Sequence, residues 1–501
     1  MSAGGVPPVD KGGVADAAPG AGPGELKVGA VVGVLVLFEL MSGFLQTGIT
    51  PLLPALGDHH GVSDSALNWV ISVQLLSGAV LVPVFGRLGD LRGRRLMLRI
   101  ALVCVAAGSV LVALAPNFTV LLLGRVLQGA LVALLPLEIA LVRDRLPVDR
   151  ARSAIARLVG ALTLGSLIGA VVMGAVAKAV DDLTVVLLLP AVFALVCVPV
   201  SMRWVPETRA RAGGSADWPG MVLLGLTLLA LLGGVSRAEE GSWLSAAVLG
   251  PLLVSVVLGV CWVRWELGRA EPLVDLRAMR GRRVAPFYLV SFFFGVMYFG
   301  SQSPNTTFLA ADPAETGYGF GLSALEIALV TLPATVAALL TSSGTALIAR
   351  RLGYRGTLAL SFALMTTGFL ALAAAHGSAT QVVVALLVCG TGIGAALSAM
   401  PTVIVEATDP ARTGVASALY NNVKTVGGAV AGGAAASVLG AFTPAGSHTP
   451  GESGYLVLWL VCAVCGLGAV AGVAVARRSE GTGADGPAAP VASAIQAESA
   501  R

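Results

Sequence analysis

The feature that most constrains this chain is a series of long apolar runs that repeats from near residue 29 to near residue 476. A helix of roughly 20 apolar residues can cross the hydrocarbon of a bilayer, and each run has about that length. Of the whole chain, 56% is hydrophobic and only 12% is charged, whereas soluble domains carry about 25% charged residues. The sequence therefore predicts an all-α integral membrane protein that uses lipid as the solvent for most of its surface.

Fourteen runs are long enough to span, and no long polar insertion separates them. They cover residues 29–56, 67–85, 96–114, 119–142, 153–177, 185–202, 218–235, 243–262, 284–310, 322–348, 357–375, 381–405, 414–439 and 455–476. We divide them into an N-terminal six-helix half, two inserted helices with flanking cytoplasmic loops, and a C-terminal six-helix half, at residues 29–204, 205–283 and 284–478. The ends, residues 1–28 and 479–501, lack apolar pattern and are predicted to be disordered cytoplasmic tails.

The charges between the runs support this count. Alternate loops carry most of the arginines, whereas the loops between them are acidic and hold only Lys178 and Arg237 as cations. Because cytoplasmic loops favour Lys and Arg, we expect a multi-pass protein of the inner (plasma) membrane with both termini in the cytoplasm. The net charge of +4 is spread over short loops, so no nucleic-acid partner is indicated.

A charged loop, GRLGDLRGRR, joins the second and third runs from Gly86 to Arg95. Its glycines, Gly86, Gly89 and Gly93, are expected to supply unusual backbone angles for a tight turn. Asp90 could accept a bidentate bond from one of the adjacent arginines. We predict a conformational latch formed by Gly86, Asp90, Gly93, Arg94 and Arg95.

The pattern Gly-x-Leu-x-Asp-x-x-Gly-Arg-Arg resembles the signature loop between helices 2 and 3 of major facilitator superfamily transporters. The loop after the tenth run is a partial second copy, because it keeps Arg351, Gly353 and Arg355 but has no acid. A second resemblance lies in LLGRVLQG, where Leu122, Arg125, Gln128 and Gly129 match the superfamily's span-4 motif Leu-x-x-Arg-x-x-Gln-Gly. That motif is commonly linked to proton coupling.

The run GVASALYNNVKTVGG resembles the corresponding helix of fourteen-helix drug:proton antiporters. The resemblance implies the major facilitator fold, with fourteen transmembrane helices as 6+2+6 and two pseudo-symmetric halves. The function implied is proton-driven efflux of drugs or small amphipathic natural products across the cytoplasmic membrane by alternating access. The partners would be a small-molecule substrate, protons and the lipid bilayer. We expect a monomer without cofactor or metal.

Two alternatives remain at this stage. In the fifth run, Ser166 stands where the antiporter motif has proline and Ala170 stands where it has glycine. An uptake permease for a metabolite, from the same superfamily, is therefore the alternative transporter. A membrane enzyme would need clustered acids, histidines or metal ligands at a membrane face, and the four histidines show no ligand spacing. We expect no enzymatic activity.

Ionisable residues inside the runs are the candidate functional groups, because a charge at mid-bilayer costs about 2.5–3.5 kcal/mol. Glu39 lies near mid-depth in the first run and is expected to bind a proton or substrate, with helix packing as the alternative role. Arg125 needs an acid or several carbonyls at its depth, and Glu39 is the nearest plausible acid. Glu138 lies near the end of its run beside Arg143, which leaves function and packing equally open.

Lys424 lies at mid-depth in the thirteenth run and shares a face with Tyr420 and Asn421. It could titrate, hold an anionic substrate, or pair with Glu39 across the two halves. The proton- and substrate-coupling residues are therefore predicted to be Glu39, Arg125, Gln128 and Lys424. The residues predicted to line the substrate cavity are Gln46, Tyr298, Gln302, Asn305, Tyr420 and Asn421.

Overall fold

A computed structural model gives the structure of the protein. It describes residues 23–206, 217–240, 245–269, 272–274, 276–279, 284–408, 413–444 and 446–481. Within these ranges every regular element is a helix. α1 begins at Pro23 and α18 ends at Gly481, so both helices extend into the predicted tails. The rest of those tails, and parts of the predicted 205–283 segment, lie outside the described residues.

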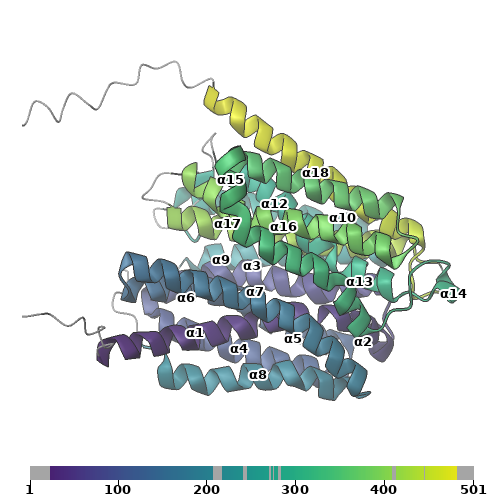
Figure 1. The fold of residues 1–501 in the computed structure, drawn as a ribbon, viewed down its shortest axis with the longest axis horizontal. Coiled ribbons are helices and arrows are strands. Elements are labelled where there is room, and N and C mark those ends of the chain that lie inside the picture. Colours follow the sequence, from purple (N-terminus) through teal and green to yellow (C-terminus); the bar gives the residue numbers. More distant parts are fainter. Residues whose placement is uncertain are drawn as a thin grey trace, which may run out of the picture.

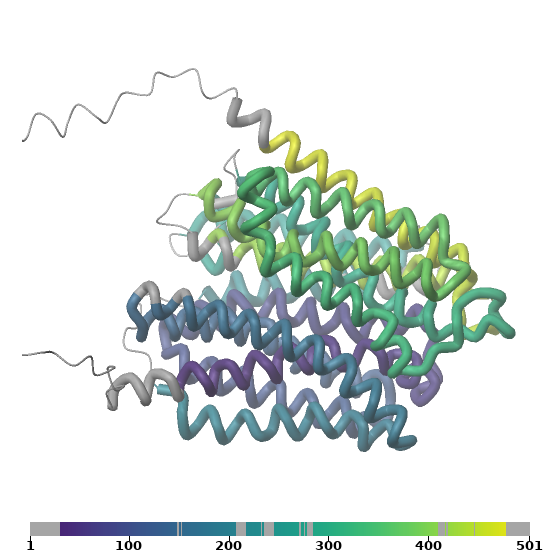
Figure 2. The backbone as a smooth tube through the Cα atoms, viewed as in Figure 1, coloured from purple at the N-terminus to yellow at the C-terminus, as the bar shows by residue number. Residues whose placement is uncertain are grey.

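The helices gather into two bundles that lie side by side, the earlier part of the chain in one and the later part in the other (Figures 1 and 2). The first bundle contains α1 (Pro23–Gly48), η1 (Thr50–Leu52), α2 (Leu53–His60), α3 (Asp64–Arg92), α4 (Arg94–Ala113), α5 (Phe118–Gln128), η2 (Gly129–Ala133), α6 (Leu134–Arg145), α7 (Val148–Ala179) and α8 (Leu183–Trp204). The second contains α12 (Ala285–Gly300), α13 (Gln302–Ala310), α14 (Pro313–Thr316), α15 (Ala324–Ala374), α16 (Ala379–Glu406), α17 (Thr413–Ala441) and α18 (Glu452–Gly481).

The inserted segment supplies α9 (Trp218–Glu240), α10 (Ala246–Gly268) and the short α11 (Leu276–Met279). α9 packs against α10 and also contacts α3 of the first half and α17 of the second. A small apolar cluster joins Trp69 and Ala436 to Leu231 and Leu252 of the inserted pair. The inserted helices therefore cover the seam between the two halves.

All fourteen predicted spans coincide with helical segments, and eleven of the described helical segments are long and apolar enough to cross a membrane. Three predicted spans are broken rather than continuous. The breaks lie at the 3-10 turn that begins at Thr50, at the 3-10 turn that begins at Gly129, and at Ser301. α15 contains two spans, because Gly353 with φ 69° and ψ 161° is not helical and turns the chain between them.

The two halves repeat one kind of helix crossing. A methyl group on Gly165 of α7 would collide with the carbonyl oxygen of Leu40 on α1, and one on Gly295 of α12 would collide with the carbonyl oxygen of Lys424 on α17. Helices can approach this closely only where small residues line the crossing. The crossings place Glu39, next to Leu40, on the first helix of its half and Lys424 on the fifth helix of its half, each beside a close approach of two helices.

We call the end of the bundle that carries the Gly93 and Gly353 turns the basic end; α1 begins and α18 ends there (Figure 1). The halves contact each other at the opposite end. There the N–H of Asp64 donates to the carbonyl oxygen of His448 at 3.1 Å, and Gly174 of α7 packs on Ala324 of α15. Towards the basic end α15 and α18 tilt away from the first half (Figure 1). The structure is therefore closed at the opposite end.

Candidate functional site

Glu39 on α1 and Glu138 on α6 form a pair of buried carboxyl groups. Both side chains are 0% exposed and lie within interaction distance of each other. Among the described residues, no hydrogen-bond donor reaches any of the four carboxyl oxygens. Two neighbouring carboxylates repel each other when both are ionised, so this arrangement favours a proton on at least one of them. The thiol of Cys197 on α8 is the other titratable neighbour of Glu138.

This pair differs from the sequence expectation in one respect. Glu39 does not pair with Arg125 or Lys424, since no ion pair to either is present among the residues described. A buried acid without a cation is costly in its ionised form, so the pair is suited to carrying a proton.

Arg125 on α5 is 1% exposed and lies at the centre of a polar network inside the first half. Its Nε donates to the carbonyl oxygen of Val70 at 2.8 Å, its Nη1 to Oε1 of Gln128 at 2.7 Å, and its Nη2 to Oε1 of Gln74. Gln128 in turn donates to Ser109 Oγ at 2.9 Å. The guanidinium is thus satisfied by carbonyl oxygens from α3 and α5, and the expected acid partner is absent from this network.

Lys424 lies in the middle of α17, with its Nζ 5.6 Å from the centre of the Tyr420 ring. This contact agrees with the predicted shared face for these two residues, and Tyr420 is 5% exposed. Lys424 is half-buried and keeps some accessible surface. Among the described residues no carboxylate or hydrogen-bond acceptor contacts its ammonium group.

The other residues predicted to line the substrate cavity contact different parts of the structure. Gln46 keeps partial exposure and donates to Ser42 Oγ at 3.5 Å. Tyr298 stacks on Phe294 with ring centres 5.7 Å apart. The break at Ser301 separates Tyr298 from the predicted residues of α13, so their spacing of four and three does not form one straight stripe.

The last three residues predicted to line the substrate cavity are Gln302 and Asn305 on α13 and Asn421 beside Tyr420. Gln302 and Asn421 are half-buried. Asn305 has its side-chain oxygen committed, since it accepts a hydrogen bond of 2.9 Å from the indole of the buried Trp459. Gln302 and Asn421 therefore remain available to a cavity, whereas Asn305 is held by α18.

The charged loop is a sharp turn between α3 and α4. Only Gly93 has a positive φ, 112°, so the expected unusual angles at Gly86 and Gly89 are wrong. Asp90 Oδ1 accepts from Arg94 Nε at 3.2 Å and from Arg94 Nη2 at 3.0 Å, which is its one ion pair among the residues described. Arg94 Nη1 donates to the carbonyl oxygen of Ala140 at 2.8 Å, and Arg95 reaches the carbonyl oxygen of Met202 at 3.5 Å. The loop thus ties α3 and α4 to the ends of α6 and α8.

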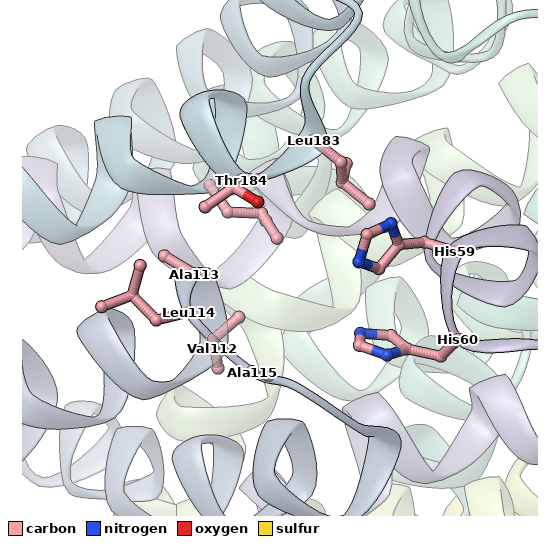
Figure 3. Close-up of a pocket in the computed structure, with 9 residues that line it drawn as sticks. His59, His60, Val112, Ala113, Leu114, Ala115, Leu183 and Thr184 are labelled. Carbon is pink, nitrogen blue, oxygen red and sulfur yellow. The ribbon is translucent and has the colours of Figure 1, made fainter.

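A separate cavity of about 170 Å³ lies at the opposite end of the first half. The rings of His59 and His60 point into it towards Thr184 of α8 and the end of α4 (Figure 3). None of the predicted site residues lines it. It is therefore distinct from the ionisable groups within the bundle.

The sequence analysis missed three residues of the site: Glu138 as a partner of Glu39, and Gln74 and Ser109 in the Arg125 network. Gln74 and Ser109 are isolated polar residues inside apolar runs, and this signal could have identified them. No sequence pattern near either residue could predict the contact between Glu39 and Glu138, because it depends on how α6 packs against α1.

Comparison with known proteins agrees with this architecture. Residues 35–432 match the Major Facilitator Superfamily. The multidrug efflux pump LfrA of Mycolicibacterium smegmatis is 28% identical over 441 residues, 84% of each chain. The lincomycin resistance protein of Streptomyces lincolnensis is 28% identical over 406 residues, 79% of this chain and 81% of the relative. A crystal structure of the nucleoside transporter NupG superposes with a TM-score of 0.60 over 90% of this chain and 98% of the other at 14% identity, which supports the fold alone.

Proposed function

Because this chain belongs to the Major Facilitator Superfamily, we propose that it is a proton-driven exporter of drugs or small amphipathic natural products. Its similarity to a multidrug efflux pump and to a lincomycin resistance protein supports export as the direction. The basic end would face the cytoplasm of a bacterial cell, in line with the positive-inside rule. The structure, closed at the opposite end, would then represent an inward-facing state.

The observation that carries proton coupling is the buried Glu39–Glu138 pair. Neither carboxyl contacts a cation among the described residues, so the pair retains a proton while it is shielded from water. When the halves rock and the pair meets water on the other side, the proton can leave or enter. A proton that crosses a potential of 100 mV supplies about 2.3 kcal/mol, and this energy would drive the cycle.

The other ionisable groups take supporting roles in this proposal. Arg125, held by Gln74 and Gln128, would fix the packing of α3 against α5 and set the positive potential near the acid pair. Lys424 would face the substrate from the second half. The loop with Asp90 and Arg94 would be a latch for the outward-facing state, in which Asp90 gains partners from the other half.

The test is a resistance and accumulation assay in an efflux-deficient bacterial strain. Cells that express the protein should accumulate less of at least one drug than cells that express Glu39→Gln, and an uncoupler should remove the difference. In everted vesicles a proton gradient should drive uptake of the same drug. Drug accumulation that is higher with the protein would instead identify an importer, and efflux unaffected by uncoupler would refute proton coupling.

A further inference from the structure

The second half holds a cation that the proton-coupling scheme does not use. Lys424 lies about 17 Å along α17 from Thr413 by the helical rise, well inside the bundle. Its main-chain carbonyl is fixed against Gly295 of α12, so the position at which the side chain leaves the helix is constrained by a backbone crossing. A lysine at this depth is costly unless a partner or water reaches it.

No acidic group pairs with this cation among the described residues. Glu39, the acid predicted as a possible partner, lies beside Glu138 and does not contact Lys424. The contact that orients the ammonium is the face of the Tyr420 ring, 5.6 Å away. The ammonium of Lys424 therefore has no counter-ion among the described residues, and a bound anion would supply one.

The surroundings of Lys424 suit an amphipathic ligand. Tyr420 offers an aromatic face on the same side of α17, and Asn421 lies one turn away. Tyr298 on the neighbouring α12 is half-buried and keeps some accessible surface, as Lys424 does. An anionic group bound by the ammonium would restore neutrality, and the rings would pack on the apolar part of the same molecule.

From this geometry, and resting on the proposed export function, we infer that Lys424 is a substrate-binding residue and that the substrates are amphipathic organic anions such as carboxylates, sulfonates or enolates. The site thereby selects against lipophilic cations of the same shape. Lys424 acts as the counter-ion of the cargo, and Tyr420 acts as its apolar platform.

Tetraphenylborate and tetraphenylphosphonium test this inference, because they match in shape and carry opposite charges. Their binding to the purified full-length protein in detergent is measured by calorimetry, with protein-free detergent subtracted. The wild-type protein should bind tetraphenylborate about tenfold or more tighter than tetraphenylphosphonium, because the ammonium attracts the anion and repels the cation. Lys424→Gln should remove that preference by weakening anion binding only, and Lys424→Arg should keep it.

Three outcomes would overturn the inference: a preference of the wild-type protein for tetraphenylphosphonium, binding of neither ion, or an equal loss for both ions in Lys424→Gln. Melting temperatures of the variants show whether they fold. Because binding is measured without a proton gradient, this result is independent of proton-driven export. Export could fail its own test while the charge preference stands, and the charge preference could fail in a protein that still exports.

Discussion

The main-chain N–H of Asp64, the first residue of α3, donates to the carbonyl oxygen of His448 in the loop before α18, at 3.1 Å. This bond joins the two halves at the opposite end. Asp64 occupies the first helical position after the cap Ser63, whose ψ of 157° is compatible with a following proline. The N–H can therefore be deleted by a substitution that the helix tolerates.

Asp64→Pro should favour the state that is open at the opposite end, relative to Asp64→Ala. Both variants lose the carboxyl group, which accepts a long bond from Tyr455, and only the proline loses the bond to His448. One hydrogen bond contributes about 1 kcal/mol, so the ratio of open to closed molecules should rise roughly fivefold. Spin labels at the exposed positions Ala55 and Glu315 would report the distance across the closure. Identical distance distributions in the two variants would show that the bond does not hold the halves together.

The loop that contains His448 is anchored to its own half by Tyr318, whose hydroxyl donates to the carbonyl oxygen of Pro450 at 2.6 Å. Burial raises the pKa of Tyr318 to about 12. Because burial holds the folded pKa above the ordinary value of 10, the neutral phenol of Tyr318 stabilises the fold fully below pH 10, and this contribution is lost as the pH rises through about 12. The melting temperature should fall over that window in the wild-type protein, and less steeply in Tyr318→Phe. Parallel pH profiles would show that the phenol does not titrate with folding.

The sequence predicted most of the fold, because composition and run length depend on single residues and not on their neighbours in space. The fourteen runs, the two halves and the Gly93 and Gly353 turns could all be read in this way. The breaks at Gly129 and Ser301 were not predicted, although each has a proline shortly after it. Pro136 and Pro304 lack the N–H groups that would bond the carbonyl oxygens of Val132 and Gly300, so each proline favours the break beside it.

The site was predictable residue by residue but not as a set of partners. Depth in an apolar run identified Glu39, Arg125 and Lys424, since the cost of a buried charge depends only on position. Which of them meet depends on the rotation of each helix about its axis, which the sequence does not specify. Arg125 therefore donates to amide and carbonyl oxygens, and Glu39 lies beside Glu138. Among the described residues, the contact of the Lys424 ammonium is with an aromatic ring.

The carboxyl pair gives the most direct mutational prediction. Glu39→Gln should reduce the rate of proton-driven transport by about tenfold or more, because an amide cannot exchange a proton. Glu138→Gln should impair it as well, since the proton is shared. Glu266→Gln is the matched control: Glu266 is also buried, at 2% exposed, but lies on the inserted α10. Rates come from gradient-driven uptake into everted vesicles, and a loss in the control equal to that in Glu39→Gln would remove the special role of the pair.

The glycine crossing of α1 and α7 predicts a stability difference between two neighbouring glycines. Gly165→Ala places a methyl group against the carbonyl of Leu40 and should destabilise the protein by about 1–3 kcal/mol. Gly160→Ala, on the same helix, meets no atom within 4 Å. It should stabilise the helix slightly, by up to about 1 kcal/mol. Thermal unfolding in detergent measures both, and equal melting temperatures would contradict the close approach of the helices.

The last prediction concerns the latch, and it distinguishes an effect on protein stability from an effect on the transport rate. The Asp90 side chain is 44% exposed, and its ion pair with Arg94 joins residues of one turn, so the pair contributes at most about 1 kcal/mol here. Arg94 keeps its bond to the carbonyl of Ala140 without it. Asp90→Asn should therefore leave expression and melting temperature nearly unchanged. If Asp90 binds the other half in the outward-facing state, the same substitution should slow transport severalfold by destabilising that state alone. Glu406→Gln, an exposed acid at the same end of the bundle, is the control and should transport normally; wild-type transport by Asp90→Asn would show that the loop is a structural turn and not a latch.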